Sequence, residues 1–148
     1  MDRLLYKQQE KMIRITKIWF EGNWMYGLSE DGKTYRQSIL WYWRLIEATP
    51  EQLNDYTLSH DGIHWRNINE DIGMDSFEER NNIEPNAMQR FFLTHRELNL
   101  AGIAKYLNIN PTLLRDYING WKTPSEARVK EIREGIRRYA LSLQNVTF

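Results

Sequence analysis

Strand signals and helix signals occupy different halves of this 148-residue chain, and this division most constrains its fold. Up to about residue 80, short β-branched and aromatic runs alternate with turn sequences, whereas residues 84–148 contain no strand candidate. Charge follows the same division. Residues 1–83 carry 10 basic and 14 acidic side chains, and residues 84–148 carry 10 basic and 6 acidic ones. The zero net charge therefore hides two segments of opposite sign, which indicates two domains.

The first half predicts a small antiparallel α+β domain over residues 12–80. The expected strands are 12–20, 24–29, 34–40, 56–59 and 63–65. Glu21-Gly22-Asn23 and Asp31-Gly32 separate the first three runs, and a glycine in such short turns is typical of β-hairpins.

Short helices are expected between these strands. Residues 41–48 have helical spacing, and residues 49–52 (Thr-Pro-Glu-Gln) form a helix start with a capping box. Residues 67–82 are acidic and rich in turn formers. We therefore expect a connector there, with a short helix near residues 76–80.

Composition excludes several classes of protein. The longest apolar run, 39–43, has five residues and is far shorter than the ~20 that cross a bilayer. The first residues lack the apolar stretch and cleavage site of a secretory signal. No cysteine is present, which excludes disulfides, thiolate metal sites and cysteine nucleophiles. We expect a cytoplasmic protein with no membrane partner and no cofactor.

The second half is expected to be all-α over residues 84–148. Its helices should start at Pro85, cover 100–107 and 111–119, and end with a long helix that Thr123 caps ahead of Pro124. The last helix carries one apolar stripe, at Val129, Ile132, Ile136, Tyr139 and Leu143. This spacing predicts that the stripe faces the core.

The middle two helices have the anatomy of a helix-turn-helix, with three residues joining them. Ala104 is small where the helices would cross, and Asn108 stands where the turn needs a positive φ. Asn110 and Pro111 cap and start the second helix, and Gly120 ends it. The predicted fold class is α+β, with the small sheet domain followed by an all-α helix-turn-helix domain.

The sequence LAGIAKYLNINPTLLRDYIN (100–119) resembles the helix-turn-helix of the Cro and phage-repressor superfamily, and the match covers about 84–143. The resemblance implies that helix 111–119 reads duplex DNA and that the protein is a homodimeric transcriptional regulator. Because the sequence shows no catalytic motif, we expect no enzymatic activity. The expected DNA-binding residues are Lys105, Asn110, Thr112, Arg115, Asn119 and Lys122. Asp116 would repel phosphate unless it accepts from a cytosine amine or pairs with Arg115 or Asn119.

An alternative explanation is a helical bundle whose charges are only solvated. The i,i+4 pairs Glu126–Lys130 and Glu134–Arg138 would account for part of the charge on the last helix. The chain would then be a non-catalytic protein-interaction module whose helical domain does not bind DNA.

Residues 44–56 (RLIEATPEQLNDY) and 62–72 (GIHWRNINEDI) resemble a small bacterial family, domain of unknown function 2442, over about residues 12–75. Arg66 replaces the usual Pro after Trp65, and Asn69 replaces the first Asp of the acidic run. The resemblance implies a small α+β domain without assigned chemistry. It also implies an antitoxin-like autorepressor role. In the alternative of a protein-interaction module, the acidic stretch 67–79 would bind the protein partner.

His60, His64, Glu70 and Asp71 are the residues that would make the first domain an enzyme or a metal site. The two histidines lie on either side of the Gly62 turn, so they lack the i,i+4 spacing of helical metal ligands. The sequence has no glycine-rich phosphate loop or nucleophile elbow. We therefore expect His64 to be structural and the Glu70-Asp71 run to be a solvated or partner-facing edge.

Overall fold

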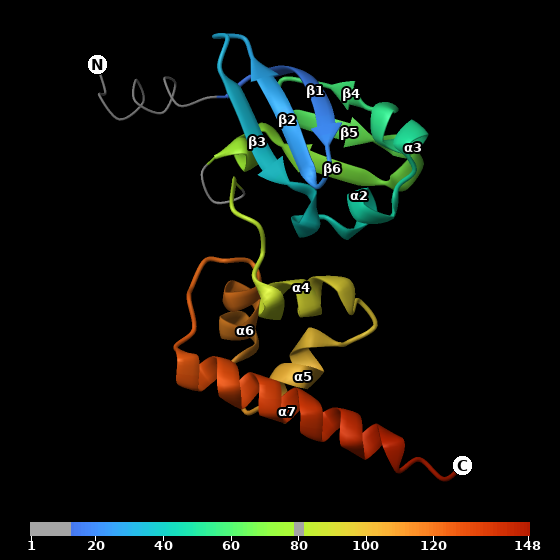
Figure 1. The fold of residues 1–148 in the computed structure, drawn as a ribbon, viewed down its shortest axis with the longest axis vertical. Coiled ribbons are helices and arrows are strands. Elements are labelled where there is room, and N and C mark those ends of the chain that lie inside the picture. Colours follow the sequence, from blue (N-terminus) through green and yellow to red (C-terminus); the bar gives the residue numbers. More distant parts are fainter. Residues whose placement is uncertain (1–12, 79–81) are drawn as a thin grey trace. The chain divides into compact units, whose positions relative to one another are not determined.

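The computed structural model describes residues 13–78 and 82–148. The chain divides into two compact units, and the boundary in the sequence lies between Pro85 and Asn86. The first unit contains all the strands of the described residues, and the second contains only helices (Figure 1). This arrangement confirms the α+β fold class.

The first unit begins with a three-stranded antiparallel sheet. Its strands are β1 (Ile15–Glu21), β2 (Trp24–Ser29) and β3 (Thr34–Ser38), in that order. The turns between them place Gly22 at φ 56° and Gly32 at φ 87°. Glycine reaches this left-handed region without a steric cost, so the two Gly turns were correctly predicted.

Short helices follow the first sheet. They are the 3₁₀ helix η1 (Ile39–Trp41), α2 (Trp43–Glu47) and α3 (Pro50–Asn54). The predicted capping box of α3 is present. The Thr49 hydroxyl accepts from the Gln52 N–H at 3.2 Å, and the Gln52 side chain accepts from the Thr49 N–H at 2.9 Å.

A second antiparallel sheet contains β4 (Thr57–Leu58), β5 (Gly62–Trp65) and β6 (Glu70–Gly73). The 3₁₀ helix η2 (Arg66–Ile68) connects β5 to β6. The prediction of a strandless connector over 67–82 was wrong, because β6 lies within it. Ile72 of β6 is buried opposite Ile63 of β5. This acidic segment is a strand because its backbone pairs with β5 and because Ile72 enters the core.

The predicted short helix near 76–80 is instead the 3₁₀ helix η3 (Met74–Phe77), and residues 79 and 80 lie outside the described residues. Met74 and Phe77 of η3 are buried in the core that the two sheets share. At the centre of this core, Met25 and Ile63 are fully buried. The Trp65 indole N–H donates to the Leu53 carbonyl at 3.0 Å, which ties the core to α3.

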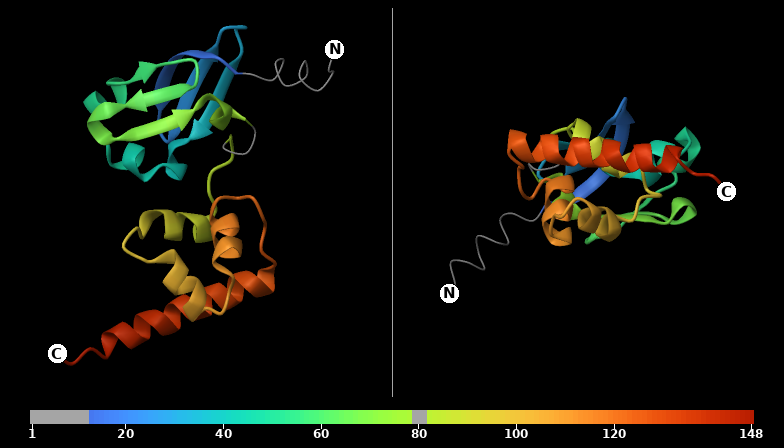
Figure 2. Two further views of the ribbon diagram at one scale, coloured as in Figure 1. Left: turned by 180° about the vertical axis from the view of Figure 1, so that it is seen from behind. Right: turned by 90° about the horizontal axis from the view of Figure 1, so that it is seen from below.

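The second unit contains α4 (Ala87–Thr94), α5 (Leu100–Tyr106), α6 (Pro111–Ile118) and α7 (Glu126–Gln144). In both views of Figure 2, α7 is the longest helix and lies along one side of the other three. No helix of the described residues has the length and apolar character that a membrane span requires.

Two predicted helix starts in this unit lie two residues before the observed ones. α4 begins at Ala87 and not at Pro85, because the Asn86 side chain caps the helix by accepting from the Gln89 N–H at 2.9 Å. Ser125, and not Thr123, caps α7, because its hydroxyl accepts from the Arg128 N–H at 3.1 Å. Both caps lie one residue past a proline, so the prolines precede the helices here instead of occupying their first turns.

Candidate functional site

The turn between α5 and α6 has the conformation that its sequence predicted. Asn108 lies at φ 57°, in the left-handed region. The next residue, Ile109, is buried and donates its N–H to the Ala104 carbonyl at 2.9 Å. The Asn110 side chain then caps α6 by accepting from the N–H groups of Thr112 at 2.8 Å and Leu113 at 3.3 Å. These bonds fix the direction in which α6 leaves α5.

The inner face of α6 packs into the core of the second unit. Leu114 and Ala104 are fully buried, and Tyr117 and Ile118 are buried beside them. Gln89 of α4 is also buried, and its side-chain amide donates to the Tyr117 carbonyl at 3.0 Å. The C-terminal end of α6 is thus held by α4, and the helix presents a fixed opposite face.

The outer face of α6 carries Thr112, Arg115, Asp116 and Asn119. Their spacing of i, i+3, i+4 and i+7 places them on one side of the helix. Thr112, Arg115 and Asn119 are exposed, and Asp116 is half-buried. The Arg115 guanidinium has no ion pair or hydrogen bond with any residue that the structure describes.

The structure places the other predicted DNA-binding residues near the two ends of this face. Lys105 is exposed on the last turn of α5. Asn110 uses its side-chain oxygen as the helix cap, so only its amide N–H groups are left for a ligand. Lys122 lies past the end of α6, and its ammonium pairs with the Asp116 carboxylate at 3.7 Å. Asp116 therefore has an ion-pair partner in Lys122, which the sequence alone did not suggest.

The sequence reasoning overlooked Trp121, which follows the end of α6. Trp121 is 66% exposed, and its backbone N–H donates to the backbone carbonyl of Asp116 at 2.9 Å. Gly120, at φ 79°, ends the helix and brings Trp121 back toward α6. The sequence signal that could have indicated Trp121 is a large aromatic residue directly after the glycine that ends a helix.

The charges of α7 pair along the helix, although not as expected. Arg128 pairs with Glu131 at 3.3 Å and Lys130 with Glu134 at 4.0 Å. Local pairing therefore accounts for part of the charge on α7.

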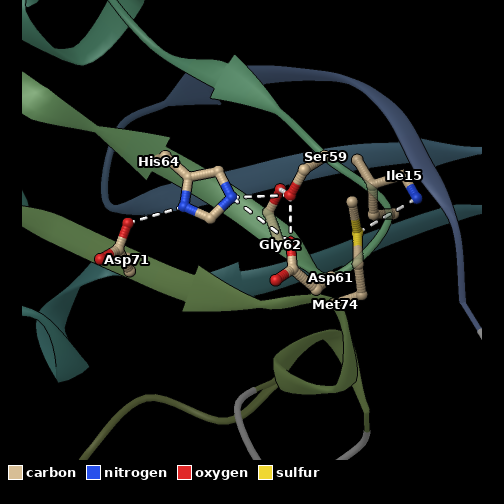
Figure 3. Close-up of polar contacts among 7 residues, drawn as sticks. All are labelled: Ile15, Ser59, Asp61, Gly62, His64, Asp71 and Met74. Atoms are coloured by element: carbon tan, nitrogen blue, oxygen red, sulfur yellow. Dashed lines mark hydrogen bonds and ion pairs between the residues drawn. The ribbon is translucent and has the colours of Figure 1, made fainter.

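A separate polar cluster lies in the first unit, around His64 of β5 (Figure 3). The His64 Nδ1 lies 2.7 Å from the Asp71 carboxylate of β6, and its Nε2 lies 2.7 Å from the Ser59 hydroxyl. The Asp61 carboxylate lies 3.5 Å from the same Nε2 and accepts a hydrogen bond from Ser59. Both imidazole nitrogens of His64 therefore have partners.

The carboxylates around His64 stabilise its charged form. The hydrogen bond with Asp71 raises the pKa of His64 above its usual value. The hydrogen bond from Ser59 lowers the pKa of Asp61. Serine, histidine and aspartate stand here in the order of a catalytic triad. However, the Ser59 hydroxyl donates its proton to the Asp61 carboxylate and not to the imidazole, so we interpret the cluster as structural.

The acidic run beside this cluster is partly paired within the unit. Glu70 lies 3.9 Å from the Arg44 guanidinium, and Asp71 binds His64. An open depression of about 390 Å³ lies along the strand ends and includes both acidic residues in its lining. Among the described residues, no group of three or more His, Cys, Asp or Glu side chains is placed to hold a metal ion.

Comparison with known proteins gives one result for the first unit. Residues 15–82 match the model of a family described as "Protein of unknown function (DUF2442)". No curated protein and no solved structure matches the chain. The N-terminal half of the chain is therefore similar to the DUF2442 family, as the sequence indicated.

Proposed function

We propose that the second unit binds duplex DNA through the outer face of α6. The observation that carries this proposal is that α6 combines an inner face held by the core with an outer face that is polar and exposed. Leu114 and the Gln89–Tyr117 hydrogen bond hold the helix, while Thr112 and Arg115 point away from the core. A recognition helix needs this combination, because base readout depends on side chains held in a fixed register.

The charge of the second unit supports the same proposal. Residues 86–148 carry ten basic and five acidic side chains, and the chain as a whole is neutral. Lys105 lies on the last turn of α5, before the turn into α6, and Lys122 lies past the end of α6. Lys105 would neutralise a phosphate of the backbone and Arg115 would reach base edges, whereas Lys122 is paired with Asp116 and would contribute less.

The resemblance of residues 84–143 to Cro and phage-repressor domains supports a regulatory role. In this proposal the protein occupies an operator and thereby represses transcription, with no cofactor and no catalytic step. An antitoxin-like autorepressor is a specific form of this role. It rests on the resemblance of the first unit to the DUF2442 family.

A protein-interaction module is the competing proposal, and the internal pairing of the acidic run weighs against it. Glu70 and Asp71 both have partners within the first unit, on Arg44 and His64. A protein that bound this edge through its charge would have to compete with these contacts. On the outer face of α6, the described residues form one internal ion pair, Asp116–Lys122.

The test is the affinity of the protein for a mixed-sequence duplex, followed by enrichment of genomic fragments. Arg115→Ala is compared with Arg133→Ala, which also removes an exposed cation, but from α7. We expect Arg115→Ala to cost about 1–3 kcal/mol of binding to the enriched fragment, and Arg133→Ala to cost much less. If both variants fold and lose the same binding free energy, then α6 is not the helix that contacts the bases. Retention of no DNA at ~150 mM salt would refute the proposal itself.

A further inference from the structure

Trp121 is the one exposed tryptophan of the chain. All six tryptophans lie within the described residues, and Trp121 is 66% exposed, whereas the other five are half-buried or buried. Among the described residues, the apolar side chains that pack on the core of the second unit do not include it. Tryptophan is highly buried on average, so an indole ring that is left in water beside a candidate binding face points to a ligand.

The end of α6 holds the backbone of Trp121 in place. The Gly120 N–H donates to the Tyr117 carbonyl at 3.3 Å, and the Trp121 N–H donates to the Asp116 carbonyl. With Gly120 in the left-handed region, these two bonds form a Schellman motif. Trp121 is therefore fixed to the helix end, and its position is defined relative to the outer face of α6.

The same motif explains why the indole ring stays exposed. In a Schellman motif, the residue after the glycine commonly makes an apolar contact with the side chain five or six positions before it. Counted from Trp121, these positions are Asp116 and Arg115, which are both charged. The helix end thus places a large apolar ring next to polar side chains of the outer face, which do not bury it.

We propose that Trp121 contacts DNA by packing its indole ring against the deoxyribose rings beside α6. The inference rests on the proposed function, because it assumes that the outer face of α6 meets a duplex. A helix in the major groove is bordered by the sugar–phosphate backbone, and Trp121 lies past the end of α6, where that backbone would pass.

Charge at this end of α6 favours a contact with sugar over one with phosphate. Asp116 and Lys122 lie on either side of Trp121 in the sequence and pair with each other at 3.7 Å, so their charges largely cancel. Little net positive charge is left there to attract a phosphate. Deoxyribose instead presents C–H groups, which suit the apolar face of an indole ring.

An apolar contact has a different salt dependence from a cation. It neutralises no phosphate and releases no counterion, so it raises the affinity without changing the slope of log affinity against log salt. It is also independent of the bases, because every nucleotide carries the same sugar. Covering about half of the exposed ring predicts roughly tenfold tighter binding.

The test measures how Trp121→Ala binds the mixed-sequence duplex and the enriched genomic fragment at several salt concentrations. We expect binding to both duplexes to weaken by the same factor, about tenfold, with the salt slope unchanged. The matched control is Leu141→Ala, which removes a 59% exposed apolar side chain from α7 and should bind as the wild type does. Thermal unfolding checks that both variants fold.

Trp121→Phe distinguishes the apolar ring from its N–H group. Phenylalanine keeps an apolar ring, so this variant should bind within about threefold of the wild type. Acrylamide quenching of tryptophan fluorescence adds a readout that a structural role would not change. DNA should protect the exposed indole of the wild type from quenching, and this protection should be absent in Trp121→Phe.

Three results would overturn the inference while the proposed function stands. They are wild-type affinity in Trp121→Ala, a loss confined to the enriched fragment, and a loss in Trp121→Phe as large as in Trp121→Ala. The second would indicate a base contact, and the third a hydrogen bond from the indole to phosphate. A wild type that retains no DNA at ~150 mM salt would instead refute the proposed function, and this inference with it.

Discussion

Asp116 offers the sharpest test of how α6 meets DNA, because it places a negative charge on the proposed reading face. Its carboxylate lies 3.7 Å from the Lys122 ammonium, and the side chains of Asp116 and Lys122 are 26% and 60% exposed. In this state the carboxylate offsets the charge of Lys122. It also repels any phosphate that approaches α6. Asp116→Asn keeps the shape of the side chain and removes both effects.

The expected size of the effect follows from the number of charges involved. Releasing Lys122 adds one phosphate contact per protein, which steepens the slope of log affinity against log salt by ~0.9. At ~0.15 M salt this corresponds to about fivefold tighter binding. The lost ion pair is exposed, so the free energy of unfolding should fall by only about 0.2–1 kcal/mol. The variant should therefore bind more tightly while being slightly less stable.

Fluorescence anisotropy with a mixed-sequence duplex, repeated at several salt concentrations, measures both the affinity and the slope. Glu131→Gln is the matched control, since it also removes one acidic charge and releases an arginine, Arg128, but on α7. It should change the affinity and the slope much less. If Asp116→Asn left the slope unchanged, or if the two variants behaved alike, then the outer face of α6 would not lie against phosphates.

Two further predictions concern the two units separately. Leu114→Ala should lower the free energy of unfolding of the second unit by about 2–5 kcal/mol, because Leu114 is fully buried. An unchanged urea midpoint by circular dichroism would contradict this packing. In the first unit, the Asp71 carboxylate raises the pKa of His64, so the folded state holds this proton more tightly than the unfolded state. This contribution is complete below the unfolded pKa of about 6.5, and the free energy of unfolding should decrease as pH rises through the folded value. His64→Gln should remove that part of the pH dependence, and an identical profile for both proteins would refute the role of the cluster.

Local structure was most predictable where neighbouring residues decide it. The capping box of α3 needs only Thr49 and Gln52, and the start of α6 needs only Asn110 and Pro111. The left-handed turn at Asn108 likewise depends on the residue itself. The sequence therefore predicted these features, together with the division into a sheet-containing half and a helical half.

Pairing across the chain decided the features that the sequence did not reveal. β6 is a strand because its backbone pairs with β5 and Ile72 enters the core, although its composition is acidic. The His64 cluster requires β5, β6 and the turn before β5 to meet, so its partners at Ser59 and Asp71 cannot be inferred from spacing alone.

In the second unit too, contacts between separate segments decided features that the sequence alone did not predict. This holds for the outer face of α6 and for α7. The sequence determined that Asp116 lies on the outer face of α6, since helical periodicity places it there. Only the tertiary structure assigned it to Lys122, because the chain turns back after Gly120. Similarly, the sequence determined the apolar stripe of α7. The extent of the core that α7 packs on decided that Ile132 is buried and Leu143 exposed.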